Sequence, residues 1–156
     1  MSLLHFFFSP YGRISRQAFW LGLIVLSAAS LPISLLLDPN PLARTNTNEI
    51  APPSLASTVW NLMLAWPSAA ISIKRFNDRD RPWWIGYLMF VAMVAMLIAN
   101  HAGLLLNPNS AAPTERLVFA GMLMFFVWAL VDNALFRGTE GPNRYGPDPL
   151  EAAEGI

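Results

Sequence analysis

Long apolar runs alternate with short polar segments along this chain. Four runs stand out, at residues 17–37, 55–73, 83–106 and 117–136. Each holds about 19–24 residues, which at 1.5 Å of rise per residue gives roughly 30 Å of helix, the thickness of the hydrocarbon core of a bilayer. Backbone groups within lipid must bond to their own segment, so these runs are predicted to be helices. The pattern predicts an all-α integral membrane protein with four transmembrane helices.

The composition supports a membrane protein with a single domain, residues 1–156. Of these residues 54% are apolar and 13% are charged, about half the charged share of an average soluble domain. A secretory signal peptide is the rival interpretation of the first run, because Arg13 and Arg16 precede it. That run continues through residues 31–37, well past the small residues of LSAAS, and a cleaved signal has no need of this continuation.

Lysine and arginine are unevenly distributed among the polar segments. Two precede the first run, four separate the second and third runs, and two follow the fourth, so that eight of the ten lie on one side. The positive-inside rule places that side in the cytoplasm. The chain is therefore predicted to form two helical hairpins, spans one–two and three–four, in the bacterial cytoplasmic (inner) membrane. Both termini are then cytoplasmic, with a short tail at residues 137–156.

Several classes of function find no support in the residues. Ten basic and ten acidic residues cancel, so net charge gives no argument for a nucleic-acid partner. The chain has no cysteine, and its two histidines, His5 and His101, are predicted to lie on opposite faces of the membrane, so no metal site and no cofactor are expected. We find no nucleophile with a base and no paired acid–base site, and we therefore expect no catalytic residues and no enzyme.

The segment KRFNDRDRPWW, residues 74–84, gathers six charged residues between two apolar runs. It is predicted to be a short cytoplasmic loop within a layer of charged and aromatic side chains at one membrane face. Such a layer can hold anionic lipid headgroups at about 1 kcal/mol per basic residue, or it can serve topology and ion pairing alone. The predicted layer comprises Arg13, Arg16, Trp20, Lys74, Arg75, Asn77, Asp78, Trp83, Trp84, Asn143, Arg144 and Tyr145.

Two polar residues fall within the predicted spans. Asp132 lies near the cytoplasmic end of the fourth span, and Asn61 lies in the second. A charged side chain in a span normally faces protein or water. We expect Arg75 or Arg13 to form a salt bridge with Asp132 that locks the fourth helix in place, with a proton or ion relay as the alternative. Gly138 is predicted to end that helix in the left-handed conformation.

Three segments, taken together, resemble a known family. They are GRISRQAFW (12–20), KRFNDRDRPWW (74–84) and GTEGPNRYGPDP (138–149). Their order and spacing are similar to those of the YhaH-like bacterial inner-membrane proteins, the domain-of-unknown-function 805 (DUF805) family. The resemblance implies a small multi-span membrane protein without an established activity. It points to Gly12, Arg13, Arg16, Phe19, Trp20, Arg75, Asp78, Trp83, Trp84, Gly138, Gly141, Asn143, Tyr145, Gly146 and Pro147.

The chain departs from the family pattern at two places in the second segment. Asn77-Asp78 stands where the family commonly has His-Asp, and Arg81-Pro82 stands where it commonly has Ser-Gly. The first departure weakens any role that requires an imidazole there, although asparagine both donates and accepts hydrogen bonds.

Four hypotheses for function follow from the sequence. The first is a non-enzymatic inner-membrane accessory, assembly or binding module, with the lipid bilayer, a larger membrane complex or further copies of the chain as partners. The alternatives are a protein that binds anionic lipid headgroups or a small anion, and a subunit of an oligomeric transporter or channel. A membrane enzyme acting on lipid-borne substrates is the weakest. The sequence leaves the ligand, the partner and the oligomeric state open.

Overall fold

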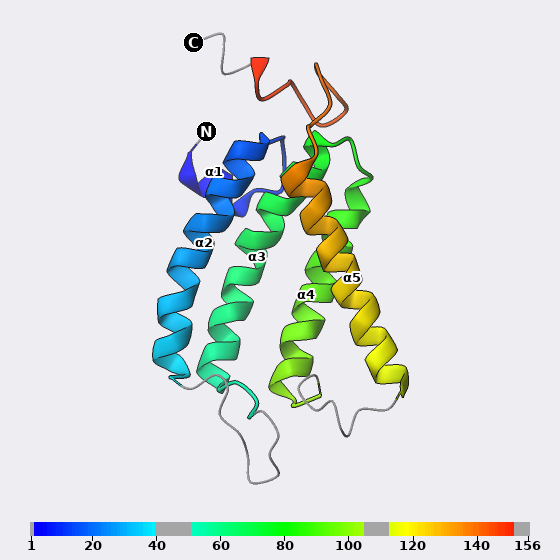
Figure 1. Ribbon diagram of the computed structural model, residues 1–156. Helices are drawn as coiled ribbons and strands as arrows, with labels where there is room; N and C mark the ends of the chain where they lie inside the picture. Colours follow the sequence, from blue (N-terminus) through cyan, green and yellow to red (C-terminus); the bar gives the residue numbers. More distant parts are fainter. Residues whose placement is uncertain (1, 40–50, 105–112, 152–156) are drawn as a thin grey trace.

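The computed structural model describes residues 2–39, 51–104 and 113–151 and confirms the all-α class. Regular structure in these residues is helical, apart from one isolated bridge between Asn143 and Gly146. Figure 1 shows the long helices side by side, with the short first helix at one end. The elements are α1 (Leu3–Phe8), α2 (Arg16–Leu37), α3 (Leu55–Asp78), α4 (Trp83–His101) and α5 (Pro113–Leu135).

Three of the predicted spans coincide with helices that are long and apolar enough to cross a membrane, namely α2, α4 and the part of α5 from Arg116 to Leu135. The helix α3 has 24 residues but a lower hydropathy, because Ser57, Asn61 and Pro67 interrupt its apolar positions. The third predicted span is too long, since α4 ends at His101, and residues 105–106 lie outside the described part of the chain.

Serine side chains begin both α2 and α3. Ser15 Oγ accepts a hydrogen bond from the backbone N–H of Ala18 at 3.3 Å, and Ser54 Oγ accepts from that of Ser57 at 3.2 Å. Each bond satisfies one of the N–H groups that a helix leaves unpaired in its first turn. The starts of these two helices are therefore encoded locally.

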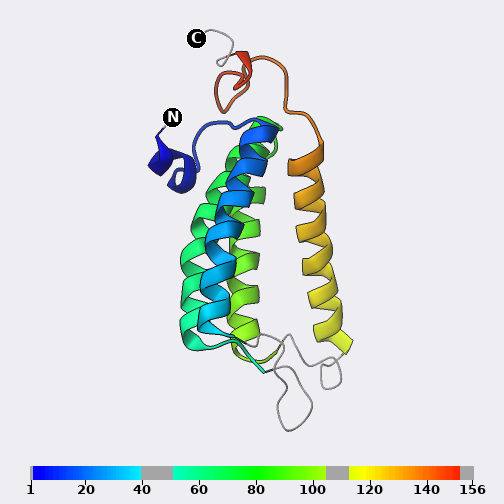
Figure 2. The ribbon, with the colours of Figure 1, turned by 60° about the vertical axis from the view of Figure 1, so that its left-hand side comes forward.

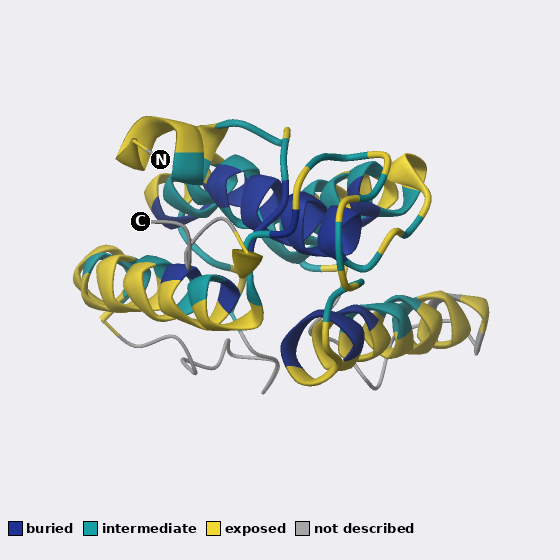
Figure 3. Cartoon of the chain, turned by 90° about the horizontal axis from the view of Figure 1, so that it is seen from above, coloured by how far each residue is buried: buried dark blue, intermediate teal, exposed yellow. Residues whose placement is uncertain are grey.

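The central element of the fold is α3, which packs against all four other helices. Its last ten residues, 69–78, are buried without interruption. In the view of Figure 3 the buried residues concentrate on this central helix, whereas the outer helices are mostly exposed. A helix with so little exposed surface in its second half does not need an apolar outer face there.

The predicted pairing of helices is half right. The first hairpin, α2 with α3, is present. The second, α4 with α5, is wrong as a description of the packing, because α4 lies chiefly against α3, and α5 contacts α2 and α3. Figure 2 shows α5 standing apart from the other helices along much of its length.

A close approach of backbones explains why α4 lies on α3. A Cβ added at Gly86 would meet Ile73 Cγ1 at 2.5 Å and Ile73 Cα at 3.2 Å. Small residues permit this kind of contact between helices in membranes. Near the same level, a buried cluster of Phe76, Met89 and Ala129 joins α3, α4 and α5.

The helix α1 and the segment that follows α5 lie at the same end of the bundle (Figure 1). This end, here named the cap end, also holds the last turns of α3. The three segments that carry the family resemblance therefore meet there.

Candidate functional site

The charged segment at residues 74–84 is mostly not a loop, so that part of the prediction is wrong. Lys74 to Asp78 form the last turns of α3, and residues 79–82 make the connection to α4. Nothing in the sequence KRFND interrupts a helix, whereas Pro82 stands at the N-cap of α4. Asp80 takes a positive φ of 52° in the tight turn between the two helices. Three of the six charges, those of Lys74, Arg75 and Asp78, therefore sit on the end of a helix, and the other three lie in the connection.

A buried ion-pair cluster is centred on Asp78. Arg13 Nε donates to Asp78 Oδ1 at 3.0 Å, and Arg75 Nη1 pairs with Asp78 Oδ2. The three side chains are 1–3% exposed. One carboxylate thus neutralises one of two buried guanidinium groups. A buried charge that lacks enough partners is costly, so the remaining N–H groups need acceptors.

Backbone carbonyl groups at the end of α5 and in the third family segment supply those acceptors. Arg13 donates to Thr139 O and to Gly141 O, both at 2.7 Å. Arg75 Nε donates to Asn133 O at 2.8 Å, and its Nη2 donates to Phe136 O. The two arginines therefore hold the end of α5 and the segment after it against α3.

Two asparagines extend the cluster. Asn77 Nδ2 donates to Gly12 O at 3.1 Å, and Asn143 Nδ2 donates to Asn77 O at 2.9 Å and to Thr139 Oγ1 at 3.0 Å. An amide side chain can serve here because the position asks for donors to carbonyl oxygens, which asparagine supplies. We name the resulting group the polar cap; it consists of the side chains of Arg13, Arg75, Asn77, Asp78, Thr139 and Asn143.

Gly138 has a different role from the predicted one. Its φ is not in the left-handed region, which among the described glycines is occupied by Gly12, Gly103, Gly141 and Gly146. A Cβ at Gly138 would instead lie 1.9 Å from Asp78 Oδ2 and 2.6 Å from Asp78 Cγ. The missing side chain is therefore what lets the segment after α5 pass over the buried carboxylate.

Asp132 is paired, as predicted, but the predicted partners are wrong. Its Oδ1 accepts from Arg79 Nη2 at 3.1 Å and from Arg81 Nη2 at 2.5 Å, and the carboxylate is 4% exposed. Arg13 and Arg75 are already bound to Asp78 and are not available. The hydrogen bond from Arg81 to Asp132 also raises the pKa of Arg81. A second carboxylate cluster thus ties the α3–α4 connection to α5.

The variant Asp132→Asn is expected to loosen that connection. An amide cannot balance two guanidinium groups, so Arg79 and Arg81 lose their common anchor while the Asp78 cluster remains intact. We expect trypsin to cleave after Arg79 at least about tenfold faster in detergent, because an opening equilibrium shifted by about 1.4 kcal/mol changes the exposed population tenfold.

Cleavage after Arg16, in the same variant, provides the internal comparison. Arg16 lies at the start of α2, donates to Leu135 O at 3.1 Å and forms no ion pair with Asp80 or Asp132. Equal acceleration at both arginines would mean that the whole cap end had unfolded, which contradicts a local role for Asp132.

The first turns of α2 also hold α5. Trp20 Nε1 donates to Ala134 O at 3.2 Å, and Arg16 Nη1 donates to Leu135 O at 3.1 Å. These carbonyls belong to the last turn of α5, where a helix has no backbone partners for them. Lys74 acts in the same way on α1, since Nζ donates to His5 O at 2.9 Å and also to Phe6 O.

The remaining predicted residues lie at the rim of the cap end or away from it. Arg144 pairs with Asp80, and Tyr145 Oη donates to Arg81 O at 2.6 Å. Trp83 and Trp84 are 65% and 51% exposed, so they face outward from the first turn of α4. Asn61 lies within α3 and donates to Ser57 O at 2.9 Å in its own helix. The structure therefore does not bring Asn61 into the site.

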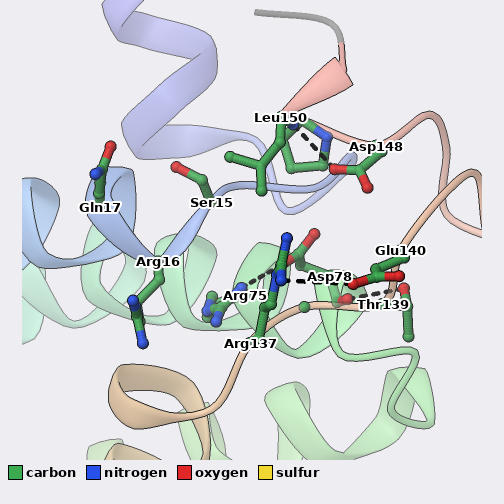
Figure 4. A pocket seen from close by; sticks show the side chains of 12 residues that line it. Ser15, Arg16, Gln17, Arg75, Asp78, Arg137, Thr139, Glu140, Asp148 and Leu150 are labelled. Carbon is green, nitrogen blue, oxygen red and sulfur yellow. Dashed lines mark hydrogen bonds and ion pairs between the residues drawn. The ribbon is translucent and has the colours of Figure 1, made fainter.

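A pocket of about 300 Å³ opens at the cap end between the start of α2 and the segment after α5. In Figure 4 the side chains of Arg16, Arg137, Glu140 and Asp148 surround it. Asp148 Oδ1 accepts from Leu150 N–H and Oδ2 accepts from Gly141 N–H, both at 2.9 Å. These backbone hydrogen bonds lower the pKa of Asp148. No group of three or more His, Cys, Asp or Glu placed to hold a metal occurs within residues 2–39, 51–104 and 113–151.

Sequence reasoning missed several residues of this site. Arg79 and Arg81 were expected only to take part in general salt bridging with the acids of the layer, Glu140 and Asp148 were named only among those acids, and Thr139 was not selected. Asp148 had one local signal, since aspartate often bonds to the N–H two residues on. The others contact residues more than fifty positions away in the chain or line a pocket, and no short-range pattern records such contacts.

Comparison with known proteins agrees with the geometry of the three segments. The family model described as "Protein of unknown function (DUF805)" matches residues 7–147. The chain belongs to the DUF805 family. Proteins named "Uncharacterized protein YiiR" from Escherichia coli K12 and from Escherichia coli O157:H7 are each 32% identical to it over 149 residues, covering 95% of this chain and 90% of theirs. No solved structure matches it.

Membership in the DUF805 family confirms the resemblance inferred from residues 12–20, 74–84 and 138–149. The matched range includes the whole polar cap and ends just before Asp148. The family description assigns no activity, so any functional statement about this chain rests on its own site.

Proposed function

We propose that this chain is a non-enzymatic multi-pass protein of the bacterial inner membrane that acts as an accessory, assembly or binding module. The observation that carries the proposal is that the buried charged side chains form ion pairs that join parts of the chain. The ion pairs of Asp78 with Arg13 and Arg75 join three chain segments. The ion pairs of Asp132 with Arg79 and Arg81 join the α3–α4 connection to α5. Charges committed in this way support a rigid platform at the cap end better than they support catalysis.

The proposed topology adds α3 to the three candidate spans in α2, α4 and α5, which makes four spans. It places both termini in the cytoplasm. Its support is the position of α3 among three helices of membrane-spanning character and the gathering of basic residues at the cap end. The exposed Trp83 and Trp84 agree with a helix start at the membrane–water interface.

Single-cysteine variants test this topology without background, because the natural chain has no cysteine. Pro142→Cys lies at the cap end and Ala102→Cys follows α4, and both positions are exposed. In intact spheroplasts a membrane-impermeant maleimide is expected to label Ala102→Cys and to label Pro142→Cys only after the membrane is opened. The reverse pattern contradicts cytoplasmic termini, and equal labelling of both positions contradicts an odd number of crossings between the two sites.

Native mass spectrometry of the chain, gently extracted from its own membrane, tests the accessory role. A fixed additional mass of larger protein subunits is the expected result. A bare protomer or a small homo-oligomer contradicts an accessory role.

A second function, binding of an anionic lipid headgroup or a small anion, has one specific observation in its favour. Arg16 and Arg137 are exposed at the mouth of the 300 Å³ pocket, where the spans α2 and α5 end. Loss of lipid retention in Arg16→Gln with Arg137→Gln, but not in Arg144→Gln, is the expected result. Transport has weaker support, since Asp132 and Asn61 are both hydrogen-bonded within the fold.

A further inference from the structure

The pocket at the cap end is lined by charged residues of both signs, which is more than the binding of an anion requires. Among the residues that line it are two exposed arginines, Arg16 and Arg137, and two carboxylates, Glu140 and Asp148. We propose that it binds the headgroup of a phospholipid with a primary ammonium, with the phosphate at the arginines and the ammonium at the carboxylates. This inference rests on the lipid-binding site of the proposed function's alternative, and it replaces the anionic ligand of that alternative with a zwitterionic one.

The other two charged residues of the lining are not available to a ligand. Arg75 and Asp78 form an ion pair with each other inside the polar cap, and both side chains are almost fully buried. The four charges that remain sum to zero, with two of each sign; Arg16, Arg137 and Glu140 are exposed, and Asp148 is 7% exposed. A headgroup without net charge therefore matches the mouth better than an anionic headgroup, for which the two carboxylates are repulsive.

The arrangement of these charges matches the order of groups in such a headgroup. Arg16 is the first residue of α2, and Arg137 follows the end of α5 by two residues, so both lie at the ends of candidate spans. Glu140 and Asp148 belong to the segment beyond α5. Figure 4 shows Arg16, then Arg137, then the two carboxylates across the pocket. In a phospholipid the phosphate lies nearer the acyl chains and the ammonium farther out, which is the same order.

The acceptor groups favour a primary ammonium over a trimethylated one. Asp148 already accepts two backbone N–H bonds, but a carboxylate has about four acceptor sites. Charge-assisted hydrogen bonds from an N–H₃⁺ group use the remaining sites, whereas a quaternary ammonium has no N–H and is recognised by aromatic rings. None of the described residues that line this pocket is aromatic.

The surroundings of the pocket favour a lipid over a soluble phosphate ester. Below Arg16, the α2 residues Leu21 and Ile24 are 62% and 60% exposed, and in the last turn of α5 Leu135 is 60% exposed. These apolar surfaces suit acyl chains. The ion pair between Arg137 and Glu140 is long, at 3.5 Å, and both side chains are highly exposed. Such a pair contributes little to stability, so a headgroup can separate it at low cost.

Native mass spectrometry with added lipids of identical acyl chains tests the proposal on the full-length chain in detergent. Phosphatidylethanolamine is expected to be retained more strongly than phosphatidylglycerol or phosphatidylcholine. Glycerophosphoethanolamine, which has the same headgroup without acyl chains, is expected not to be retained. Retention of this soluble compound at the level of the lipid would overturn the lipid assignment.

Glu140→Gln gives the decisive comparison, because Glu140 is exposed and lies outside the polar cap. Retention of phosphatidylethanolamine is expected to fall about threefold, the effect of losing one partly exposed ion pair, while retention of phosphatidylglycerol rises. Arg137→Gln is expected to lower both. Glu151→Gln changes the same charge outside the pocket and is expected to change neither.

Unchanged lipid selectivity in Glu140→Gln, or a wild-type preference for phosphatidylglycerol, would overturn the inference. The second of these outcomes would leave the anionic-lipid alternative standing. The accessory role is tested separately, by the mass of any associated protein. A result that contradicts the accessory role is therefore distinguishable from one that contradicts the binding of this lipid.

Discussion

Asp78→Asn is expected to lower the free energy of unfolding by about 3–5 kcal/mol, the cost of removing one partner from a buried ion pair. Asp78 is the anion that faces both Arg13 and Arg75 in the polar cap. Without its charge, two guanidinium groups remain buried with only uncharged oxygen atoms as partners. Because the same cluster joins α3 to the segments before α2 and after α5, the cap end is expected to open as a unit. Denaturant titration in detergent, followed by tryptophan fluorescence, measures the loss.

Asp80→Asn is the matched control for this prediction. Asp80 lies two residues away and also pairs with an arginine, Arg144, but the two side chains are 45% and 54% exposed. An exposed pair contributes about 0–1 kcal/mol, so this variant is expected to unfold close to the natural protein. Similar losses for the two variants would mean that the Asp78 cluster is not a structural centre.

Gly138→Ala is expected to be nearly as damaging, although it adds a single methyl group to a residue that is not fully buried. That methyl group would lie 1.9 Å from Asp78 Oδ2, so either the segment after α5 or the carboxylate has to move. Movement of the carboxylate breaks its contacts with Arg13 and Arg75. Forcing extra atoms into a packed site costs about 1–3 kcal/mol, and the partial loss of the ion pair adds to it.

Gly121→Ala controls for the chemistry of the substitution. Gly121 lies in the middle of α5 and a Cβ there meets no atom within 4 Å. Since alanine favours a helix over glycine by about 1 kcal/mol, this variant is expected to be neutral or slightly stabilising. The double variant Gly138→Ala with Asp78→Asn is expected to lose less than the sum of the single losses, because the two changes damage one cluster. Strict additivity would place the effect of Gly138 elsewhere.

The sequence by itself determined the four long helices and the gathering of charged residues near their ends. A run of about twenty apolar residues is predicted to be helical whatever its neighbours are, because its backbone groups have no other partners in lipid. Ser15 and Ser54 mark two helix starts by local hydrogen bonds. Family membership was also readable, because residue order within short segments carries it.

The sequence also indicated that the three family segments belong together, but not how they are joined. Arginines occur in all three segments, and each is long enough to reach several carboxylates. In the structure Asp78 pairs with Arg13 and Arg75, and Asp132 pairs with Arg79 and Arg81. This pairing depends on how far α3 extends and on where α5 ends relative to it. Those are distances between helices, and periodicity along one helix does not contain them.

Only the tertiary structure decided that α3 is central, that α4 lies against it, and that Gly138 is required for space and not for its backbone conformation. The physical reason is the same in each case. Local sequence controls backbone conformation through hydrogen bonding and solvation, which act within a few residues. Packing, ion pairing and the shape of a pocket depend on which atoms from distant segments meet, and the folded chain alone sets that.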